Sequence, residues 1–260
     1  MRYLLLLLLP FYSFSQPNCE QFKDEKCKSA CELAIKAEHY QWTKDGQIMF
    51  DESIKNCPSI SFSWREKSVP YLKSGDFITW KQLIDKAVEY DLKGNLGYRG
   101  WCKYQFFRDY KGAIKDIELL DSLVNYNIGY SQNGDYHLNI AKALCYSGLG
   151  QNLKAIEIIE NQLKVENYSP GYYDYYQLGV TYFKVKDIPK ALKCFQRQTE
   201  IFKLAENDYY LAKIYKSQNK LAEYKIHKDN ALALYRGYNK MKDVYTHHFN
   251  KVYLKTIETE

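Results

Sequence analysis

The clearest pattern in the chain is a pair of apolar faces with helical spacing between residues 175 and 195, which read YYQLGVTYFKVKDIPKALKCF. Four residues recur at i, i+3, i+4 and i+7 and predict one helix face: Tyr175, Leu178, Gly179 and Tyr182. Ala191 and Phe195 form an i, i+4 pair on a second helix, which begins near Pro189, where a missing N–H is tolerated. Because Gly179 and Ala191 are small, the pattern predicts two antiparallel helices in close contact.

The same arrangement recurs along the chain at a nearly constant interval. Equivalent positions near the start of each second helix are separated by 34, 33, 42, 36 and 33 residues: Gly46, Trp80, Ala113, Ala155, Ala191 and Tyr224. A repeat of about 34 residues accounts for every interval except the one of 42. That interval contains residues 124–133, for which we expect a loop or a helix extension. An insertion of this kind is a candidate contact element.

Residues 175–195 resemble the tetratricopeptide repeat (TPR), whose pattern is W-x2-L-G-x2-Y, followed by A-x3-F and often by Pro. The resemblance covers most of residues 25–235, although Gly100 stands one place early in the third copy. It implies an all-α, right-handed α-solenoid of about six TPR-like helix hairpins. We expect residues 16–60 to form a degenerate, Cys-rich first hairpin, residues 61–235 the TPR array, and residues 236–260 a C-terminal cap over the last repeat.

Residues 1–15 have the pattern of a secretory signal peptide. Arg2 supplies the positive end, Leu4 to Leu9 form the apolar core, and Ser13 and Ser15 give a small-x-small cleavage site. The apolar run is shorter than the roughly 20 residues of a spanning helix, so we predict no membrane span. An uncleaved anchor is the alternative. The signal predicts an exported protein, periplasmic or secreted, and its style indicates a bacterial cell envelope.

Four of the seven cysteines lie within the first 57 residues: Cys19, Cys27, Cys31 and Cys57. In an exported protein such a cluster suggests disulfides. Antiparallel helices place the start of one beside the end of the next, which favours a bond from Cys57 to Cys27 or Cys31. A metal site is less favoured, because CKSAC is not a CxxC knuckle and no His stands at ligand spacing. The other three are expected to be buried thiols: Cys102, Cys145 and Cys194.

Charge and motifs restrict the chemistry. The chain has 37 Lys and Arg against 31 Asp and Glu, a formal net charge of +6, which is too mild and too evenly spread to indicate nucleic acid. It has no G-x-S-x-G, H-E-x-x-H, phosphate-loop or dinucleotide motif. His247 and His248 would point in different directions on a helix, so we expect exposed or capping histidines rather than a metal site. We therefore expect no catalysis, no metal and no cofactor.

The binding surface is the remaining question. A repeat array binds through the concave surface that its first helices line. The TPR resemblance implies these contact residues: Arg65, Tyr98, Gln105, His137, Tyr173, Tyr176, Tyr209, Lys213 and Lys216. Tyrosines, of which the chain has 26, supply rigid contact area with a polar tip, unless they merely cover a solvated groove. The basic residues favour an acidic or C-terminal segment.

These patterns predict a non-catalytic scaffold that binds a peptide or a partner protein on the concave TPR surface. The alternative is an accessory or sensory module that binds a small ligand or a glycan in the Tyr-rich groove.

Overall fold

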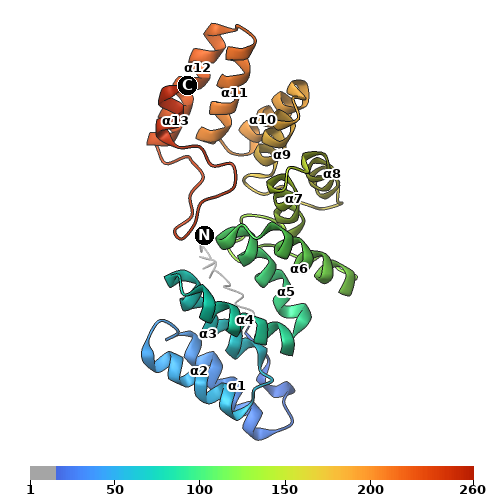
Figure 1. The fold of residues 1–260 in the computed structure, drawn as a ribbon, viewed down its shortest axis with the longest axis vertical. Coiled ribbons are helices and arrows are strands. Elements are labelled where there is room, and N and C mark those ends of the chain that lie inside the picture. The colour runs from blue at the N-terminus through green and yellow to red at the C-terminus, as the bar shows by residue number, and fades with distance from the viewer. Residues whose placement is uncertain (1–15) are drawn as a thin grey trace, which may run out of the picture. The chain divides into compact units, whose positions relative to one another are not determined.

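The computed structural model describes residues 16–260, which form α-helices arranged in antiparallel hairpins (Figure 1). The predicted signal peptide, residues 1–15, lies outside the described residues. The chain divides into two compact units: unit 1 ends at Asp91, and unit 2 runs from Leu92 to Glu260. The predicted all-α hairpin architecture is confirmed.

Unit 1 contains two hairpins preceded by a short 3-10 helix. Its elements are η1 (Cys19–Gln21), α1 (Glu25–Glu38), α2 (Lys44–Asn56), α3 (Ser61–Ser74) and α4 (Phe77–Tyr90). Polar side chains start three of the helices: those of Asp24, Thr43 and Asp76 each accept a hydrogen bond from a first-turn N–H. Such caps satisfy N–H groups that have no partner within the helix.

Two disulfides cross-link the first hairpin. Cys19 is bonded to Cys31, with Cα atoms 5.6 Å apart, and Cys27 is bonded to Cys57, with Cα atoms 5.0 Å apart. The second bond joins the first turn of α1 to the residue that ends α2, one of the two pairings expected for Cys57. Alanines of α1 and Phe50 of α2 are buried beside these bonds. Because so small a core contributes little stability, the disulfides are expected to matter for folding.

Unit 2 contains four hairpins and a short terminal helix. Its elements are α5 (Leu92–Cys102), the π-helical turn η2 (Lys103–Phe107), α6 (Tyr110–Leu123), α7 (Leu138–Gly148), α8 (Asn152–Leu163), α9 (Asp174–Lys184), α10 (Ile188–Ile201), α11 (Ala205–Ser217), α12 (Leu221–Arg236) and α13 (Leu254–Thr259). Each helix from α5 to α12 packs against the next. The second helices α6 and α10 begin alike, since Asp109 and Asp187 accept hydrogen bonds from the N–H groups three residues later.

The displaced glycine of the third copy coincides with a local change in helix geometry. Gly100 and Tyr104 are four residues apart, whereas the TPR pattern places the two residues three apart. The helix widens into the π-turn η2 at this point. A π-turn accommodates one extra residue within a helix, so Tyr104 still reaches the core and is fully buried.

The interval of 42 residues is explained by a loop and not by a longer helix. α6 ends at Leu123, and residues 124–137 form an irregular connection in which Tyr130 and His137 make an isolated antiparallel bridge. Ile128 and Tyr136 are buried, while Tyr126 is 65% exposed. The loop is therefore anchored to unit 2 at several points, and its role as a contact element stays a prediction.

Gly179 provides the close helix approach that the sequence predicts. A Cβ atom at this position would lie 2.6 Å from a ring carbon of Phe195, which is fully buried on α10. Ala191, the second small residue of the pair, is also fully buried. The α9–α10 contact therefore has no room for a larger side chain at position 179.

Gly179→Leu is expected to lower the free energy of unfolding by roughly 1–3 kcal/mol, because the added side chain must displace Phe195. Leucine has a better helix propensity than glycine, by up to about 1 kcal/mol. The expected loss already includes this favourable contribution. Urea unfolding followed by far-UV circular dichroism measures the change. Ala222→Leu, at an exposed position of α12, is the control and should shift stability by less than about 0.5 kcal/mol. Equal midpoints for the two variants would contradict the close approach.

Candidate functional site

The C-terminal part of unit 2 forms a strap, residues 237–253, which contains no helix or strand. Figure 1 shows it as a long red loop that leaves α12, extends toward α6 and returns to α13. Its hydrogen bonds go to η2, α9 and α11. We call the surface formed by α5 with η2, α7, α9 and α11 the first-helix surface, because these are the first helices of successive hairpins. The strap lies along it.

Helix α9 holds the strap at Phe249 and Asn250. The Tyr176 hydroxyl donates to the Asn250 carbonyl (2.5 Å), and Gln177 Nε2 donates to the Phe249 carbonyl (2.9 Å). The Asn250 side chain donates to Gln177 Oε1 (2.7 Å) and accepts from Lys184 Nζ (3.0 Å). Asn250 has a φ of 60°, a left-handed conformation that asparagine tolerates better than most residues. Its main chain and side chain are thus both recognised.

The tip of the strap is held by η2, which continues α5, and by Arg108 directly after it. Gln105 Nε2 donates to Thr246 Oγ1 (2.6 Å), and the Arg108 guanidinium donates to the His247 carbonyl. Phe249 meets the Tyr110 ring edge to face, at 6.0 Å between centroids, and the Lys184 ammonium lies 4.6 Å from the Phe249 centroid. An aromatic side chain with a cation near its face is a favourable contact.

His248 is buried at the centre of the strap, whereas its neighbour His247 is exposed. Its ring lies 6.1 Å from that of Tyr136 and 5.2 Å from that of Tyr173. Since the Lys242 carbonyl, 3.1 Å away, can only accept, His248 Nε2 carries the proton. Burial lowers the pKa of His248. The expectation of an exposed or capping side chain is therefore wrong for His248, because the strap is not helical and packs this ring against Tyr136 and Tyr173.

Helix α11 contacts both ends of the C-terminal segment. Ala205 N–H donates to the Asn239 carbonyl (2.9 Å), and the Met241 N–H donates to Glu206 Oε1 (3.1 Å). Burial raises the pKa of Glu206 to about 7. At the other end, the Glu260 carboxylate lies 3.5 Å from the ammonium groups of both Lys213 and Lys216.

The last hairpin is covered by the same segment. Val252 and Ile257 are buried in a small cluster with Tyr209 of α11 and Ala231 of α12. That residues 236–260 act as a C-terminal cap stays a prediction. The residues that pack on the last hairpin are continuous with the strap, so one segment contacts both this hairpin and the first-helix surface.

Six of the nine predicted contact residues contact the C-terminal segment: Gln105, Tyr173, Tyr176, Tyr209, Lys213 and Lys216. His137 lies elsewhere, bonded to Asn127 and capping α7, and burial lowers its pKa to about 4. Tyr98 packs near Trp101 on α5. Arg65 belongs to unit 1, where it pairs with Glu66. The role of all nine in binding a partner stays a prediction.

The sequence reasoning missed Gln177 and Asn250, which form the most specific contact of the surface. Gln177 follows the predicted Tyr176 directly and carries no signal beyond its place on a first helix. Asn250 lies 73 residues away in the sequence, and polar pairs at such a separation leave no periodic pattern.

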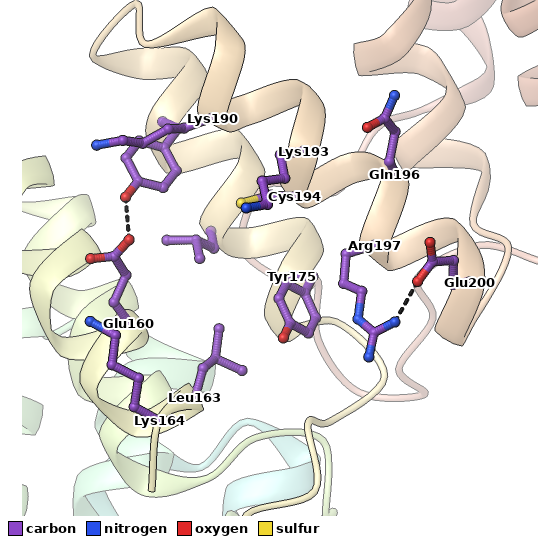
Figure 2. A pocket seen from close by; sticks show the side chains of 12 residues that line it. Glu160, Leu163, Lys164, Tyr175, Lys190, Lys193, Cys194, Gln196, Arg197 and Glu200 are labelled. Carbon is purple, nitrogen blue, oxygen red and sulfur yellow. Dashed lines mark hydrogen bonds and ion pairs between the residues drawn. The ribbon is translucent and has the colours of Figure 1, made fainter.

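A pocket of about 600 Å³ lies among α8, α9 and α10 (Figure 2). Its charged lining consists of Lys164, Lys190, Lys193, Arg197, Glu160 and Glu200. Tyr182 donates to Glu160 Oε1 (2.5 Å), and Arg197 pairs with Glu200. Two carboxylates are thus already engaged, and the excess of cations suits a ligand with an anionic group. Cys194 also lines the pocket, but burial raises the pKa of its thiol to about 12, so it is no thiolate nucleophile at neutral pH.

Three further observations bear on chemistry. Cys102, Cys145 and Cys194 are buried and form no disulfide. Between residues 16 and 260, no cluster of three or more His, Cys, Asp or Glu side chains has the arrangement of a metal site. In the same part of the chain, every helix is too short or too polar to cross a membrane.

Comparison with known proteins supports the fold. No protein-family model matches the chain. The TPR repeat-containing protein MJ1428 of Methanocaldococcus jannaschii is 24% identical over 147 residues, which cover 55% of this chain and 24% of that protein. The chain therefore spans about a quarter of the length of this curated relative.

Solved structures agree over a larger part of the chain. PilF of Pseudomonas aeruginosa gives a TM-score of 0.62 at 13% identity, covering 82% of this chain and 94% of PilF. The type IV pilus biogenesis factor PilW gives 0.61 at 13% identity, covering 82% and 95%. The Cut9–Hcn1 hetero-tetramer of APC/C gives 0.54 at 13% identity, covering 80% of this chain and 39% of the matched chain. The chain therefore has a TPR-like solenoid fold.

Proposed function

We propose that this chain is a non-catalytic scaffold that binds a short segment of a partner protein on the first-helix surface of unit 2. The main support is that side chains of this surface already hold a main-chain segment without helix or strand there. Arg108 donates to the His247 carbonyl, Gln177 to that of Phe249 and Tyr176 to that of Asn250. Main-chain carbonyls are common to all proteins, so such donors suit a surface that binds peptide segments.

The comparisons support a binding role by analogy of fold. PilW is described as a pilus biogenesis factor, and Cut9 is part of a hetero-tetramer. Fold alone does not fix function, so the partner of this chain has to be inferred from its own surface. The proposal of a non-catalytic role agrees with the protonated state of the Cys194 thiol and with the lack of catalytic motifs in the sequence.

The two disulfides of unit 1 support an extracytoplasmic setting, because such bonds persist mainly in oxidising compartments. Residues 1–15, with the pattern of a signal peptide, support the same setting. We therefore place the scaffold in the periplasm or outside the cell, as the sequence predicts.

The partner segment is proposed to be acidic where it meets α11. Lys213 and Lys216 face a carboxylate in this structure, that of Glu260. Both pairs are 3.5 Å long and partly exposed, so each stabilises the position of Glu260, beyond the strap, by less than about 1 kcal/mol. The lysines are thus available to a partner at little cost to the fold.

Binding to a partner recovered from envelope extract and identified by mass spectrometry tests this proposal. Lys213→Glu/Lys216→Glu is expected to weaken binding at least about fivefold at low salt, since two attractions become repulsions. Biolayer interferometry with the purified partner measures the affinity. Lys115→Glu/Lys225→Glu, at exposed sites on α6 and α12, introduces the same charge change and should leave the affinity nearly unaltered. An equal loss of affinity in both double variants would show that the partner does not bind beside Lys213 and Lys216.

The small-ligand alternative is favoured by one observation, the pocket among α8, α9 and α10. Its volume of about 600 Å³ falls in the usual range of small-molecule sites. Tyr175 and Tyr182 line the pocket, with the Arg197 guanidinium 6.0 Å from the Tyr175 ring centroid and the Lys190 ammonium 5.1 Å from that of Tyr182. A thermal-shift screen of glycans and peptides separates the two functions: stabilisation by a glycan, lost in Tyr175→Ala, would support the alternative.

A further inference from the structure

We propose that the strap is a self-ligand: Thr246–Asn250 occupy the first-helix surface as a partner segment does, and the partner is a segment that presents an aromatic–asparagine pair in a similar turn and displaces them. This inference rests on the proposed function and names the chemistry of its partner.

Recognition of the strap is specific for an aromatic residue followed by asparagine. The Asn250 side chain uses its donor on Gln177 Oε1 and its acceptor on Lys184 Nζ. An aspartate there would place a second acceptor against Gln177 Oε1, and an alanine would leave Gln177 without its partner. Phe249 lies between the Tyr110 ring and the Lys184 ammonium. The surface therefore recognises two consecutive side chains, those of Phe249 and Asn250, in addition to the main chain.

The strap leaves part of the surface unsatisfied. Gln105 Oε1, Arg108 Nη1 and His248 Nδ1 are buried and have no hydrogen-bond partner within residues 16–260. A buried polar atom without a hydrogen-bond partner destabilises the bound state of the strap. A segment that offers a donor to Gln105 and a further acceptor to Arg108 gains two bonds that the strap does not make. When such a segment displaces the strap, His248 also leaves its buried site, and its unpaired ring nitrogen becomes hydrated.

The strap is buried at Met241, His248 and Val252, and the part between Met241 and His248 is more exposed. Met241 is fully buried and Val252 is 5% exposed, whereas Val244 between them is 90% exposed. The intervening residues form no helix or strand that would have to unfold. The middle of the strap can therefore leave the surface once the contacts of Thr246–Asn250 break, while Met241 and Val252 stay buried, an opening of the kind that local stability differences permit.

Occupation by the strap makes partner affinity depend on the fraction of open molecules. The apparent dissociation constant equals the intrinsic constant divided by that fraction. Weakening the strap should therefore strengthen binding of a competing segment, up to the point at which every molecule is open. If the strap were only a structural cap, weakening it would lower the affinity for a competing segment, because the binding surface would lose its folded shape.

The test uses the full chain with its disulfides intact and a fluorescein-labelled peptide of residues 242–253 as the probe. Fluorescence anisotropy should show at least about tenfold tighter binding to Phe249→Ala/Asn250→Ala than to the wild type. Val244→Ala, a strap change at an exposed site, should bind the peptide like the wild type. A peptide in which alanines replace Phe249 and Asn250 should bind neither the wild-type chain nor any variant. In the Phe249→Ala/Asn250→Ala chain, the further change Gln177→Ala should abolish most of the increase in peptide affinity. Equal binding by the weakened and wild-type chains would overturn the proposal.

A second measurement covers the case in which the double variant does not fold, as judged by far-UV circular dichroism. In the wild-type chain, an excess of unlabelled peptide should accelerate hydrogen exchange of the amides of residues 244–250 and leave α1–α4 unchanged. Unchanged exchange at saturating peptide would also overturn the proposal.

The two proposals fail separately. If the peptide binds the weakened chain but no partner protein depends on Lys213 and Lys216, the self-ligand stands and the scaffold function fails. If a partner binds the first-helix surface but the peptide never does, the function stands and the aromatic–asparagine recognition fails.

Discussion

Replacing Cys27 and Cys57 by serine is expected to lower the unfolding free energy of unit 1 by about 3.6 kcal/mol, the loop-closure value for a separation near 30 residues. The bond joins the start of α1 to the end of α2, so its loss frees the whole first hairpin in the unfolded state. The unit has a small core and few other long-range constraints, and native disulfides of small exported domains typically contribute about 2–5 kcal/mol.

Tryptophan fluorescence during urea unfolding measures this change selectively, because three of the four tryptophans belong to unit 1: Trp42, Trp64 and Trp80. Cys19→Ser/Cys31→Ser is the matched comparison. Its loop has a separation of 12 residues, and its loss should cost about 2.8 kcal/mol on the same model. A reducing agent should also lower the urea midpoint of the wild-type chain. A midpoint that reductant does not change would contradict the disulfide-stabilised first hairpin.

Asp116→Ala is expected to destabilise unit 2 by about 3–5 kcal/mol, because it leaves a buried ion network without its anion. Asp116 lies on α6, and its side chain is only 2% exposed. It accepts two hydrogen bonds from Arg99 of α5, from Nε and from Nη2, each of 2.8 Å. Lys103 Nζ adds a third at 2.7 Å. The cations are 17% and 21% exposed, so partial hydration places the expected cost at the lower end of the range.

Far-UV circular dichroism during urea unfolding measures the effect of Asp116→Ala. Asp116→Asn keeps the shape and part of the hydrogen bonding, so it should cost less than the alanine change. Asp229→Ala, at an exposed site of α12, is the control and should stay within about 0.5 kcal/mol of the wild type. Equal stability of the Asp116→Ala and Asp229→Ala variants would show that the network does not stabilise the α5–α6 hairpin.

Local patterns predicted the hairpins because the residues that form each contact lie within one repeat. Gly179, Ala191 and Phe195 are at most 16 residues apart, and their sizes dictate how closely α9 and α10 pack. The same antiparallel geometry predicted a bond from Cys57 to Cys27 or Cys31, and the structure has the first of these. In each case the sequence separation is short and the spacing itself encodes the contact.

The strap could not be predicted in the same way. Its contacts join residues as far apart as Gln105 and Thr246, which are 141 positions apart, and a segment without helix or strand leaves no apolar period. Sequence reasoning treated Tyr176 as an accessible contact residue, whereas its ring is fully buried beneath the strap and against α10 and α11. A tyrosine on a first helix has the same pattern whether water, a partner or the chain itself covers it.

We propose that the first-helix surface of unit 2 binds protein segments and that the chain's own strap occupies it. The decisive experiment is hydrogen exchange on the full chain, with and without the purified partner. We expect the partner to protect amides at the N-terminal turns of α9 and α11, while residues 244–250 of the strap lose protection. Protection confined to the second helices, with the exchange of the strap unchanged, would contradict it.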